Sequence, residues 1–322
     1  MKTQDRKKIA PQIITQTLKT HPVAIVLVVL VIIFSIFFPE RFLTSMNFTS
    51  ILKQFTTLML FALGPSMLVV MGSLDLSFVG IWMLGGILVW ILTPVLGMSS
   101  IFIIPVLGIF TGFMIGIIQV KAKIPSFILT LSLLVIYSGL TATFAGGYTR
   151  HVTGYDFITM KLIPYFPSAF LWTIPLIVAA IYIMKRTSMG VYIYAIGSNE
   201  EGARLAGINV DKYKILAFTM SGLFTGIGSI ILFQHLGAAV PLELNLNEMT
   251  MPLVAIVLGG TPLLGGSGGP QRTVLGALTF SVLYRGLLLS MVNPYALQLL
   301  IGLLLIISIV VGSRGLKGVN VT

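Results

Sequence analysis

The chain has 322 residues, of which 56% are hydrophobic and only 9% are charged, and its mean hydropathy is +1.02. A soluble globular domain carries roughly 25% charged residues, so this composition excludes a soluble protein and indicates a polytopic membrane protein. The net charge of +11 does not indicate a nucleic-acid partner, because the basic residues are scattered at the ends of apolar runs. The absence of cysteine excludes disulfides and cysteine metal sites.

Ten apolar segments approach the length of about 20 residues that a transmembrane helix needs. The sequence therefore predicts an all-α polytopic membrane protein of about ten transmembrane helices, some of them broken or re-entrant. The predicted transmembrane domain covers residues 22–312, between an N-terminal arm at 1–21 and a C-terminal tail at 313–322. The ten segments are 22–38, 54–71, 78–96, 101–120, 127–144, 169–184, 215–235, 250–264, 273–291 and 295–311.

The positions of lysine and arginine predict how these segments are oriented. If the N-terminus is inside, 15 of the 20 basic residues fall on cytoplasmic pieces and four on outer pieces, while Arg285 falls within a segment. Cytoplasmic loops carry an excess of lysine and arginine. We therefore expect both termini of this multi-pass protein in the cytoplasm. The same reasoning places the polar stretch at 185–214 in the cytoplasm.

That polar stretch contains the pattern of a short surface helix. Ser198, followed three residues later by Glu201, is a capping box in which the hydroxyl accepts from a first-turn N–H group and the carboxylate reaches back. Gly207 can take the left-handed position after the helix, and Asn209 could cap the next helix. Taken alone, the pattern fits an ordinary solvated loop with a helical turn as well as it fits a functional element.

Three places interrupt the predicted helices: the sequence around Gly72, an outer loop at 145–168, and the glycine-rich run at 258–270. Backbone groups freed by glycine and proline are tolerated at membrane depth only where protein or a water-filled cavity satisfies them. Broken helices near the middle of the membrane are typical of transporters. The interruptions therefore favour solute transport.

Four polar residues within or beside the spans are candidates for the translocation path: Asp75, Ser77, Arg285 and Asn293. An acid beside a span is a functional candidate by default, but Asp75 also fits the role of a cap for the helix that follows it. Arg285 is favoured to snorkel toward the nearby end of its span, and the alternative is a donor to hydroxyls or an anion in the path. Both readings stay open for each residue.

Catalytic and nucleotide-binding signatures are missing from the sequence. The glycine-rich run has no GxxxxGK[ST] pattern and follows no predicted strand. The three histidines, His21, His151 and His235, lie on separate segments, and no metal-ligand or hydrolase spacing occurs. We therefore expect no catalytic residues, no metal and no cofactor in this chain. If ATP drives it, another subunit hydrolyses the ATP.

Several long motifs in the chain closely resemble the permease subunits of the ribose, galactoside and autoinducer-2 family of bacterial ABC importers. They are YIYAIGSNEEGARLAGINVDKYKILAFTMSGLFTGIGSIIL, GSLDLS, KIPSFILTLSLLVIYSGL and VLGGTPLLGGSGG, and the likeness covers nearly the whole chain from about residue 50 onward. The resemblance implies a ten-span permease in the lipid of the bacterial inner (plasma) membrane. It also implies that the permease pairs with a second permease, with ATP-binding subunits in the cytoplasm and with a solute-binding protein outside.

The resemblance also implies that 197–207 is the cytoplasmic helix that couples the permease to the ATP-binding subunit. The residues that it assigns to coupling are Gly197, Ser198, Asn199, Glu200, Glu201, Ala203, Arg204 and Gly207. Outer loops at 145–168 and 237–248 are expected to receive the binding protein. The solute could be a pentose, a hexose, an autoinducer-like furanose or, with less support, a nucleoside.

The chain departs from the family pattern at several positions. Ser73 replaces the second glycine of the family's GGIDLSVGS motif, and Phe78 and Val79 replace its Val-Gly pair. Residues 249–251 replace an expected Glu-Leu-Asp, and Ser267 replaces an arginine. The missing acid and base lead to the hypothesis that this permease is one half of a heterodimer; a homodimer is the alternative.

Two other function classes remain as alternatives. A gradient-driven secondary transporter usually carries intramembrane acids or histidines for ion coupling, and the spans offer almost none beyond Asp75. A structural or assembly protein would leave the polar cytoplasmic helix and the broken spans unexplained.

Overall fold

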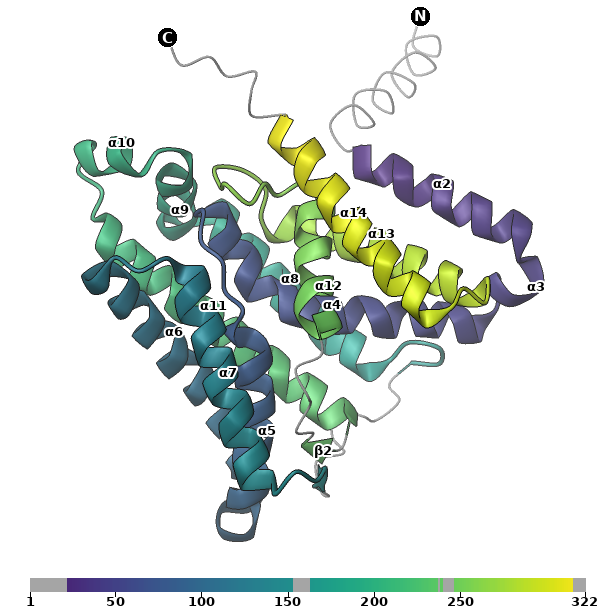
Figure 1. Cartoon of the computed structure of the whole chain (residues 1–322), viewed down its shortest axis with the longest axis horizontal. Coiled ribbons are helices and arrows are strands. Elements are labelled where there is room, and N and C mark those ends of the chain that lie inside the picture. Colours follow the sequence, from purple (N-terminus) through teal and green to yellow (C-terminus); the bar gives the residue numbers. More distant parts are fainter. Residues whose placement is uncertain (1–21, 153–162, 237, 240–245, 315–322) are drawn as a thin grey trace, which may run out of the picture.

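The computed structural model describes residues 22–152, 163–236, 238–239 and 246–314 (Figure 1). The described chain is almost entirely helical, and its only strands are two short ones that pair with each other. In chain order the helices are α2 (Pro22–Phe37), α3 (Pro39–Phe42), α4 (Ser45–Val70), α5 (Ser77–Leu96), the 3₁₀ helix η1 (Gly97–Phe102), α6 (Ile103–Ala122), α7 (Ser126–Ala145), α8 (Ser168–Arg186), α9 (Ser188–Ser198), α10 (Glu200–Leu205), α11 (Val210–Leu236), α12 (Leu246–Leu258), α13 (Pro270–Leu289) and α14 (Pro294–Arg314).

By length and composition, six helical stretches within the described residues can cross a membrane. One of them, Ser77–Ala122, contains α5 and α6 joined by η1. Three shorter apolar helices lie at Pro22–Phe37, Met249–Leu258 and Tyr295–Ile307. The protein is therefore a multi-pass membrane protein, as predicted. A helix overlaps each of the ten predicted segments, but a count of ten membrane crossings stays a prediction.

Helix α4 forms the centre of the bundle. Eighteen of its 26 residues are buried, including the fully enclosed Met59, Leu63 and Met67. It begins at Ser45, nine residues before the predicted start, because Thr44 caps it: the Thr44 hydroxyl accepts from the N–H of Asn47 at 3.1 Å. It ends in a Schellman arrangement that requires the left-handed conformation of Gly72.

Helix α11 is the second buried helix, and it packs on α6 through glycines. Gly108, Gly112 and Gly116 form a GxxxGxxxG series on α6, and Gly222 and Gly226 form the matching pair on α11. A Cβ atom at any of these five positions would collide with the backbone of the other helix. Small residues let two backbones approach closely, which is the usual basis of tight helix packing in membranes.

The predicted segment 250–264 is wrong at its C-terminal end. Helix α12 stops at Leu258, and the rest of the segment belongs to a loop. Gly260 adopts φ +90°, and the N–H groups of Gly260 and Thr261 donate back to the carbonyls of Val257 and Ile256. This closes the helix in a second Schellman arrangement. The apolar residues that follow misled the prediction, because a loop buried in protein can be as apolar as a helix.

Strands β1 (Arg150–His151) and β2 (Ala238–Ala239) pair in antiparallel fashion and connect the α7–α8 loop to the α11–α12 loop. The Arg150 guanidinium lies over the Trp90 ring, 4.6 Å from its centroid, and its Nε donates to the carbonyl of Ala145 at 2.9 Å. The two loops that were expected to receive a binding protein are thus fastened to each other and to α5. Much of each loop lies outside the described residues.

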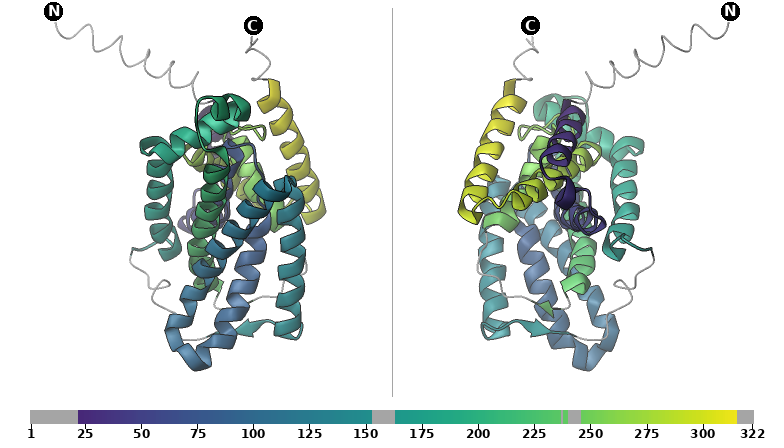
Figure 2. Two further views of the ribbon diagram at one scale, coloured as in Figure 1. Left: turned by 90° about the vertical axis from the view of Figure 1, so that its left-hand side faces the viewer. Right: turned by 90° about the vertical axis from the view of Figure 1, so that its right-hand side faces the viewer.

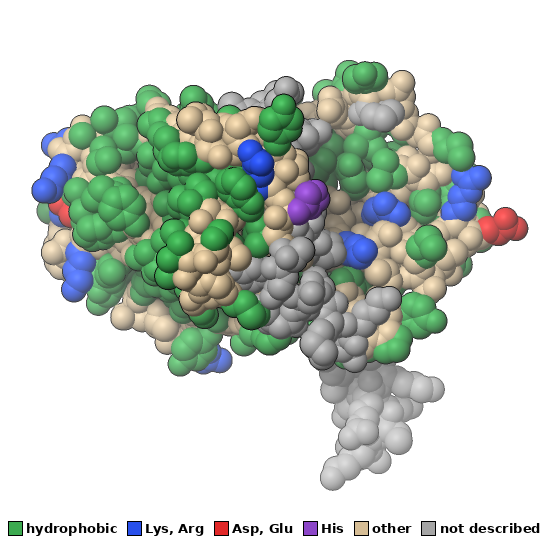
Figure 3. Space-filling model, turned by 90° about the horizontal axis from the view of Figure 1, so that it is seen from below, with side chains coloured by type: hydrophobic (Ala, Val, Ile, Leu, Met, Phe, Trp, Pro, Cys, Tyr) green, Lys and Arg blue, Asp and Glu red, His purple; other side chains and the backbone are tan. Residues whose placement is uncertain are grey.

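The molecule has two distinct ends (Figure 2). The start of α2, the end of α14 and the short helix α10 lie at one end, while η1 and β2 lie at the other (Figure 1). Seen from that second end, basic side chains are scattered among hydrophobic ones and acidic side chains are few (Figure 3). The N-terminal arm at 1–21 and residues 315–322 lie outside the described residues, so the expected sidedness of the termini stays a prediction.

Candidate functional site

The predicted surface helix at 197–207 is present as α10, Glu200–Leu205. Its cap, however, is Asn199 and not Ser198: the Asn199 side chain accepts from the N–H of Gly202 at 2.8 Å. Ser198 is the last residue of α9, and its hydroxyl donates to the Tyr194 carbonyl at 2.8 Å. The capping-box prediction was wrong by one residue because a serine inside a helix satisfies its hydroxyl on the preceding turn.

The C-terminal end of α10 forms as the sequence predicts. Gly207 has φ +84°, the N–H of Ile208 donates to the Ala203 carbonyl, and the N–H of Gly207 donates to the Arg204 carbonyl. These two bonds make a Schellman motif. Asn209 then caps α11 by accepting from the N–H of Lys212 at 3.0 Å, as predicted. A helix of only six residues is held at both ends by specific hydrogen bonds.

Ion pairs attach α10 to the first turns of α11. Lys214 donates to Glu200 at 2.7 Å and Arg204 donates to Asp211 at 2.8 Å, while Arg204 also lies 3.7 Å from Glu200. The hydrogen bond to Asp211 raises the pKa of Arg204 above its ordinary value, so the guanidinium stays charged. Exposed pairs add little stability one by one, but several charges in a network fix geometry. The network sets the angle between α10 and α11.

The outward face of α10 leaves two side chains uncommitted. Leu205 is 85% exposed, which is unusual for leucine on a rigid polar helix, and Glu201 is exposed without an ion-pair partner in the described part of the chain. The opposite face is anchored, since Ala203 is buried in the main hydrophobic cluster. The helix is therefore fixed from below and presents an apolar residue beside a free carboxylate.

A polar cavity of about 650 Å³ lies beside this network, between α10 and the turn that joins α6 to α7. Lys123, in that turn, adopts the left-handed conformation that is uncommon for a side-chain-bearing residue. None of the described residues forms a group of three His, Asp or Glu side chains that could hold a metal ion. The residues that line the cavity are Gln119, Val120, Lys123, Ile124, Pro125, Glu200, Arg204, Asp211 and Lys214.

Asp75 lies in the break between α4 and α5 and is only 1% exposed. One carboxylate oxygen accepts from the N–H and the hydroxyl of Ser77 at 2.8 and 2.6 Å, and the other accepts from the Ser221 hydroxyl of α11 at 3.2 Å. The N–H bond joins Asp75 to the first residue of α5, but the N-cap position is Leu76, which makes no side-chain capping bond, so Asp75 lies one residue before the cap position suggested for it. The bond to Ser221, 146 residues away, could not be predicted from the sequence and makes Asp75 a link between α5 and α11.

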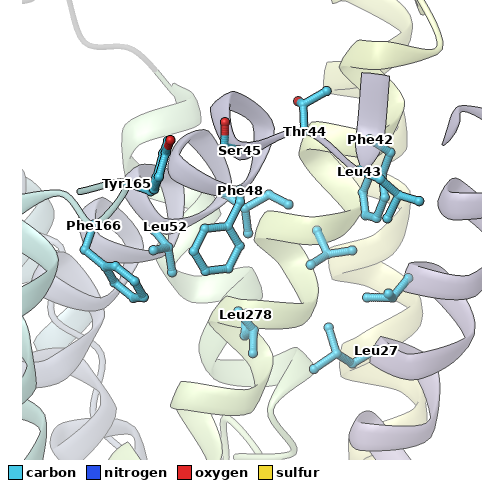
Figure 4. Close-up of a pocket in the computed structure, with 13 residues that line it drawn as sticks. Leu27, Phe42, Leu43, Thr44, Ser45, Phe48, Leu52, Tyr165, Phe166 and Leu278 are labelled. Carbon is cyan, nitrogen blue, oxygen red and sulfur yellow. The ribbon is translucent and has the colours of Figure 1, made fainter. Parts of the chain in front are cut away.

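The other candidate path residues do not join Asp75. Arg285 is half-buried in α13, and its Nε is buried without a hydrogen-bond partner among the described residues. Asn293 is exposed, and its side chain caps α14 by accepting from the N–H of Tyr295 at 2.9 Å. A separate cavity of about 590 Å³ between α2, α4 and α13 contains none of the four candidates (Figure 4). Its lining carries no charge, so it is an apolar cavity rather than a polar solute site.

Two of the three breaks predicted from the sequence, the one around Gly72 and the glycine-rich run, meet beside α9. A Cβ atom at Gly197 would collide with the Val70 carbonyl at the end of α4, and the same carbonyl accepts from the N–H of Gly266 at 2.8 Å. Tyr194 and Gln271 join the contact through hydrogen bonds to the glycine-rich loop. The sequence analysis missed these two residues, although a glutamine directly after Pro270 at the start of an apolar helix is a usable signal.

A family model described as "Branched-chain amino acid transport system / permease component" matches residues 47–309, which is most of the chain. The chain belongs to this family. The match includes the break after α4, the helices α9 and α10, and the glycine-rich loop, so the family pattern extends over all the contacts described above. No solved structure matches the chain.

Curated relatives of the permease are import permeases for sugars. It is 29% identical over 302 residues to the ribose import permease protein RbsC of Escherichia coli (strain K12), covering 90% of this chain and 92% of the relative. It is 31% identical over 301 residues to RbsC of Bacillus subtilis (strain 168), covering 89% and 91%. It is 28% identical over 315 residues to the fructose import permease protein FrcC of Rhizobium meliloti, covering 91% and 86%. The chain is thus an ABC importer permease of the inner membrane, and it is similar in sequence to permeases named for sugars.

Proposed function

We propose that this permease moves a sugar or sugar-like solute that an external binding protein delivers, and that α10 couples it to a separate ATP-binding subunit. The relatives import ribose, fructose, and xylose or arabinose by name. The observation that carries the coupling role is the construction of α10. It is a doubly capped, charge-fixed helix that presents Leu205 and Glu201.

An exposed leucine on a rigid support suits a protein partner. Binding energy concentrates in a few anchors that enter a pocket of the partner, and pre-organised elements lose less entropy on binding. A charged rim around the anchor favours correct orientation and a reversible contact. The cap at Asn199 and the ion pairs of Glu200 and Arg204 supply this rigidity. These features support an interface that must form, transmit force and persist through many cycles.

In the proposed transport cycle, the ATP-binding subunit acts on the permease through α10. ATP hydrolysis on the partner subunit would displace α10, and the ion pairs would pass the displacement to α11. Because α11 contacts Asp75 through Ser221, the movement would reach the break between α4 and α5. The permease itself needs only weak affinity for the solute, since selectivity can reside in the binding protein. Weak affinity of the permease would explain why the candidate path residues do not lie together in one charged pocket.

The outer face is the proposed docking site of the binding protein, and a second permease completes the pathway. The β1–β2 pair holds the α7–α8 and α11–α12 loops together at the end opposite α10. The second permease is either another copy of this chain or, as the heterodimer hypothesis holds, a different permease. Full transport activity of a purified homodimer would exclude the heterodimer hypothesis.

The first experiment is gentle extraction of the tagged permease from its native membrane, with mass spectrometry of the proteins that co-purify. We expect an ATP-binding subunit in near-equal amount. A permease that is repeatedly recovered alone and still moves solute would instead support a secondary transporter driven by an ion gradient.

The second experiment tests the coupling helix directly. Glu201→Arg should keep the permease folded but lower ATP-driven uptake, because the reversed charge lies on the proposed contact face. Glu40→Arg is the matched control: Glu40 is also exposed and without an ion-pair partner among the described residues, but it lies on α3, away from α10. Normal uptake by Glu201→Arg would remove α10 from the mechanism.

A further inference from the structure

Helix α9, which leads into α10, is fastened to the glycine-rich loop by a tyrosine hydroxyl. The Tyr194 hydroxyl donates to the Gly268 carbonyl at 2.6 Å and accepts from the Gln271 side-chain amide at 3.1 Å. Gln271 also donates to the Gly268 carbonyl, so the three groups form a closed set. We call Tyr194, Gly268 and Gln271 the tyrosine latch. Helix α9 lies beside α10 at the same end of the molecule (Figure 1).

The loop that the latch holds is rich in glycine and is closed by an internal hydrogen bond. Gly260, Gly265, Gly266, Gly268 and Gly269 all have positive φ, in the region that favours glycine. Its base is closed by the N–H of Gly269, which donates to the Thr261 hydroxyl at 3.0 Å. A loop stabilised by internal bonds moves as a unit. Since Gly269 and Pro270 are the cap and first residue of α13, movement of the loop is movement of the start of α13.

Beside the latch, the N–H of Gly266 donates to the Val70 carbonyl of α4, but the remaining contacts between α9 and the loop are packing contacts. Gly197 packs on the Val70 carbonyl, and Gly266 lies against Ser198. Such contacts block approach but resist separation only weakly, because dispersion between a few atoms is small. The hydrogen bonds of Tyr194 are therefore the directional connection between α9 and the loop. These hydrogen bonds can hold the loop to α9 when the two move apart, whereas the packing contacts act only when they approach.

We propose that Tyr194 is a positioning residue that makes the glycine-rich loop and α13 follow the coupling segment during transport. This proposal rests on the proposed function of α10 and adds a second output to it. The ion pairs of α10 lead to α11, whereas the tyrosine latch leads to α12 and α13, the C-terminal part of the bundle. Without the latch, ATP hydrolysis would drive α11 while α13 lags behind.

The chemistry of the latch suits a connection that must also release. The side-chain oxygen of Gln271 is buried and has no hydrogen-bond partner among the described residues. Leaving a buried acceptor unpaired is costly, so the latched state is less favourable than a fully satisfied network. A rearrangement that gave this oxygen a donor would offset the loss of the Tyr194 bonds. The latch can therefore break without the full cost of a saturated site.

Tyr194→Phe tests the proposal by removing one oxygen atom from the complete importer with its ATP-binding and solute-binding partners. Tyr192→Phe is the matched control: it lies on the same helix, is also half-buried, and its hydroxyl makes no hydrogen bond with the described residues, while its ring packs on Tyr213. Solute uptake and ATP hydrolysis are measured on the same proteoliposomes. We expect uptake per ATP to fall by about two- to tenfold in Tyr194→Phe, the range for a lost net hydrogen bond.

A second variant separates positioning from stability. Gln271→Leu removes the other donor of the latch but leaves the bond from Tyr194 to Gly268, so we expect a smaller loss of uptake per ATP than in Tyr194→Phe. The double variant should be little worse than Tyr194→Phe alone, because that change already removes both bonds of Tyr194. Additive losses would show that the residues act independently and would overturn the latch.

Each remaining outcome decides one of the two proposals. If uptake and ATP hydrolysis fall together with the amount of folded complex, Tyr194 has only a structural role and the inference is wrong. If uptake per ATP equals that of Tyr192→Phe, the inference is also wrong, while the coupling role of α10 stands. If the native permease assembles with no ATP-binding subunit, the proposed function itself fails.

Discussion

Gly108 of α6 and Gly222 of α11 face each other where the two helices touch backbone to backbone, and a Cβ atom on either glycine would collide with the carbonyl oxygen of the other. The same relationship continues one turn on, where Gly112 lies against the Phe218 carbonyl. In lipid there is no hydrophobic force between helices, so close packing of this kind supplies much of their association. The α6–α11 pair is therefore a closely packed unit that joins α6 to the buried helix α11.

Gly222→Val should destabilise the permease because its side chain has no space against α6. Inserting extra methyl groups into a packed interface costs about 1–3 kcal/mol. Gly139→Val is the control, since Gly139 is exposed in α7 and a Cβ there meets nothing within 4 Å. Thermal unfolding in detergent measures the difference. Equal midpoints for the two variants would contradict the packing described for α6 and α11.

Asn199→Ala should loosen α10, whereas Ser198→Ala should not. Loss of a capping side chain costs about 0.5–2 kcal/mol, so the amides of Gly202 and its neighbours should exchange with deuterium about 2- to 30-fold faster. Ser198 makes its hydrogen bond within α9 and serves as the control. Faster exchange in Ser198→Ala than in Asn199→Ala would restore the capping box that the sequence suggested.

Ser221→Ala should weaken the permease by removing a donor from the buried carboxylate of Asp75. An unsatisfied buried group costs about 1–3 kcal/mol, more if it is charged. Ser229→Ala is closely matched: it lies two turns along α11, is equally buried, and its hydroxyl has no hydrogen-bond partner among the described residues. Thermal unfolding and the solute KM are measured together. A change in KM without a change in stability would instead make Asp75 a solute ligand.

Trp90→Leu should loosen the outer loop by removing the aromatic face beneath Arg150. A cation–π contact of this kind contributes about 0.5–1 kcal/mol at an exposed site. Trp172→Leu is the control, because Trp172 is 45% exposed and makes no ring contact with the other described residues. Proteolysis of the α7–α8 loop should accelerate only in Trp90→Leu. Equal rates for both variants would show that Arg150 is held by its bond to Ala145 alone.

Helices and their order were predictable from the sequence because apolar length is a strong signal in a membrane protein. The ends were less predictable where a side chain outside the apolar run caps the helix. Thr44 starts α4 before its apolar run, and Gly260 stops α12 inside one. Local chemistry also misassigned the cap of α10 to Ser198, because the preceding helix continues through that serine.

Long-range contacts within the candidate site lay beyond sequence reasoning. Asp75 was a candidate both for a cap and for the translocation path, but nothing local connects it to Ser221. The glycine-rich loop was identified as a break, but its contact with Tyr194 depends on how α9 and α13 pack. A sequence shows which groups must find partners, and the fold determines which partners they find.

The two ends of α11 are both fastened. Its N-terminal end is paired with α10 through Lys214 and Glu200, and beyond its C-terminal end Ala238 pairs with His151 of the α7–α8 loop. Between these ends the glycines of α6 hold its flank. A helix held at both ends and along one side is restrained from sliding along its axis, and the movement left to it is rotation about that axis. A fluorescence or spin label on an exposed residue of α11 should therefore report rotation of the helix, and not translation along its axis, during the transport cycle.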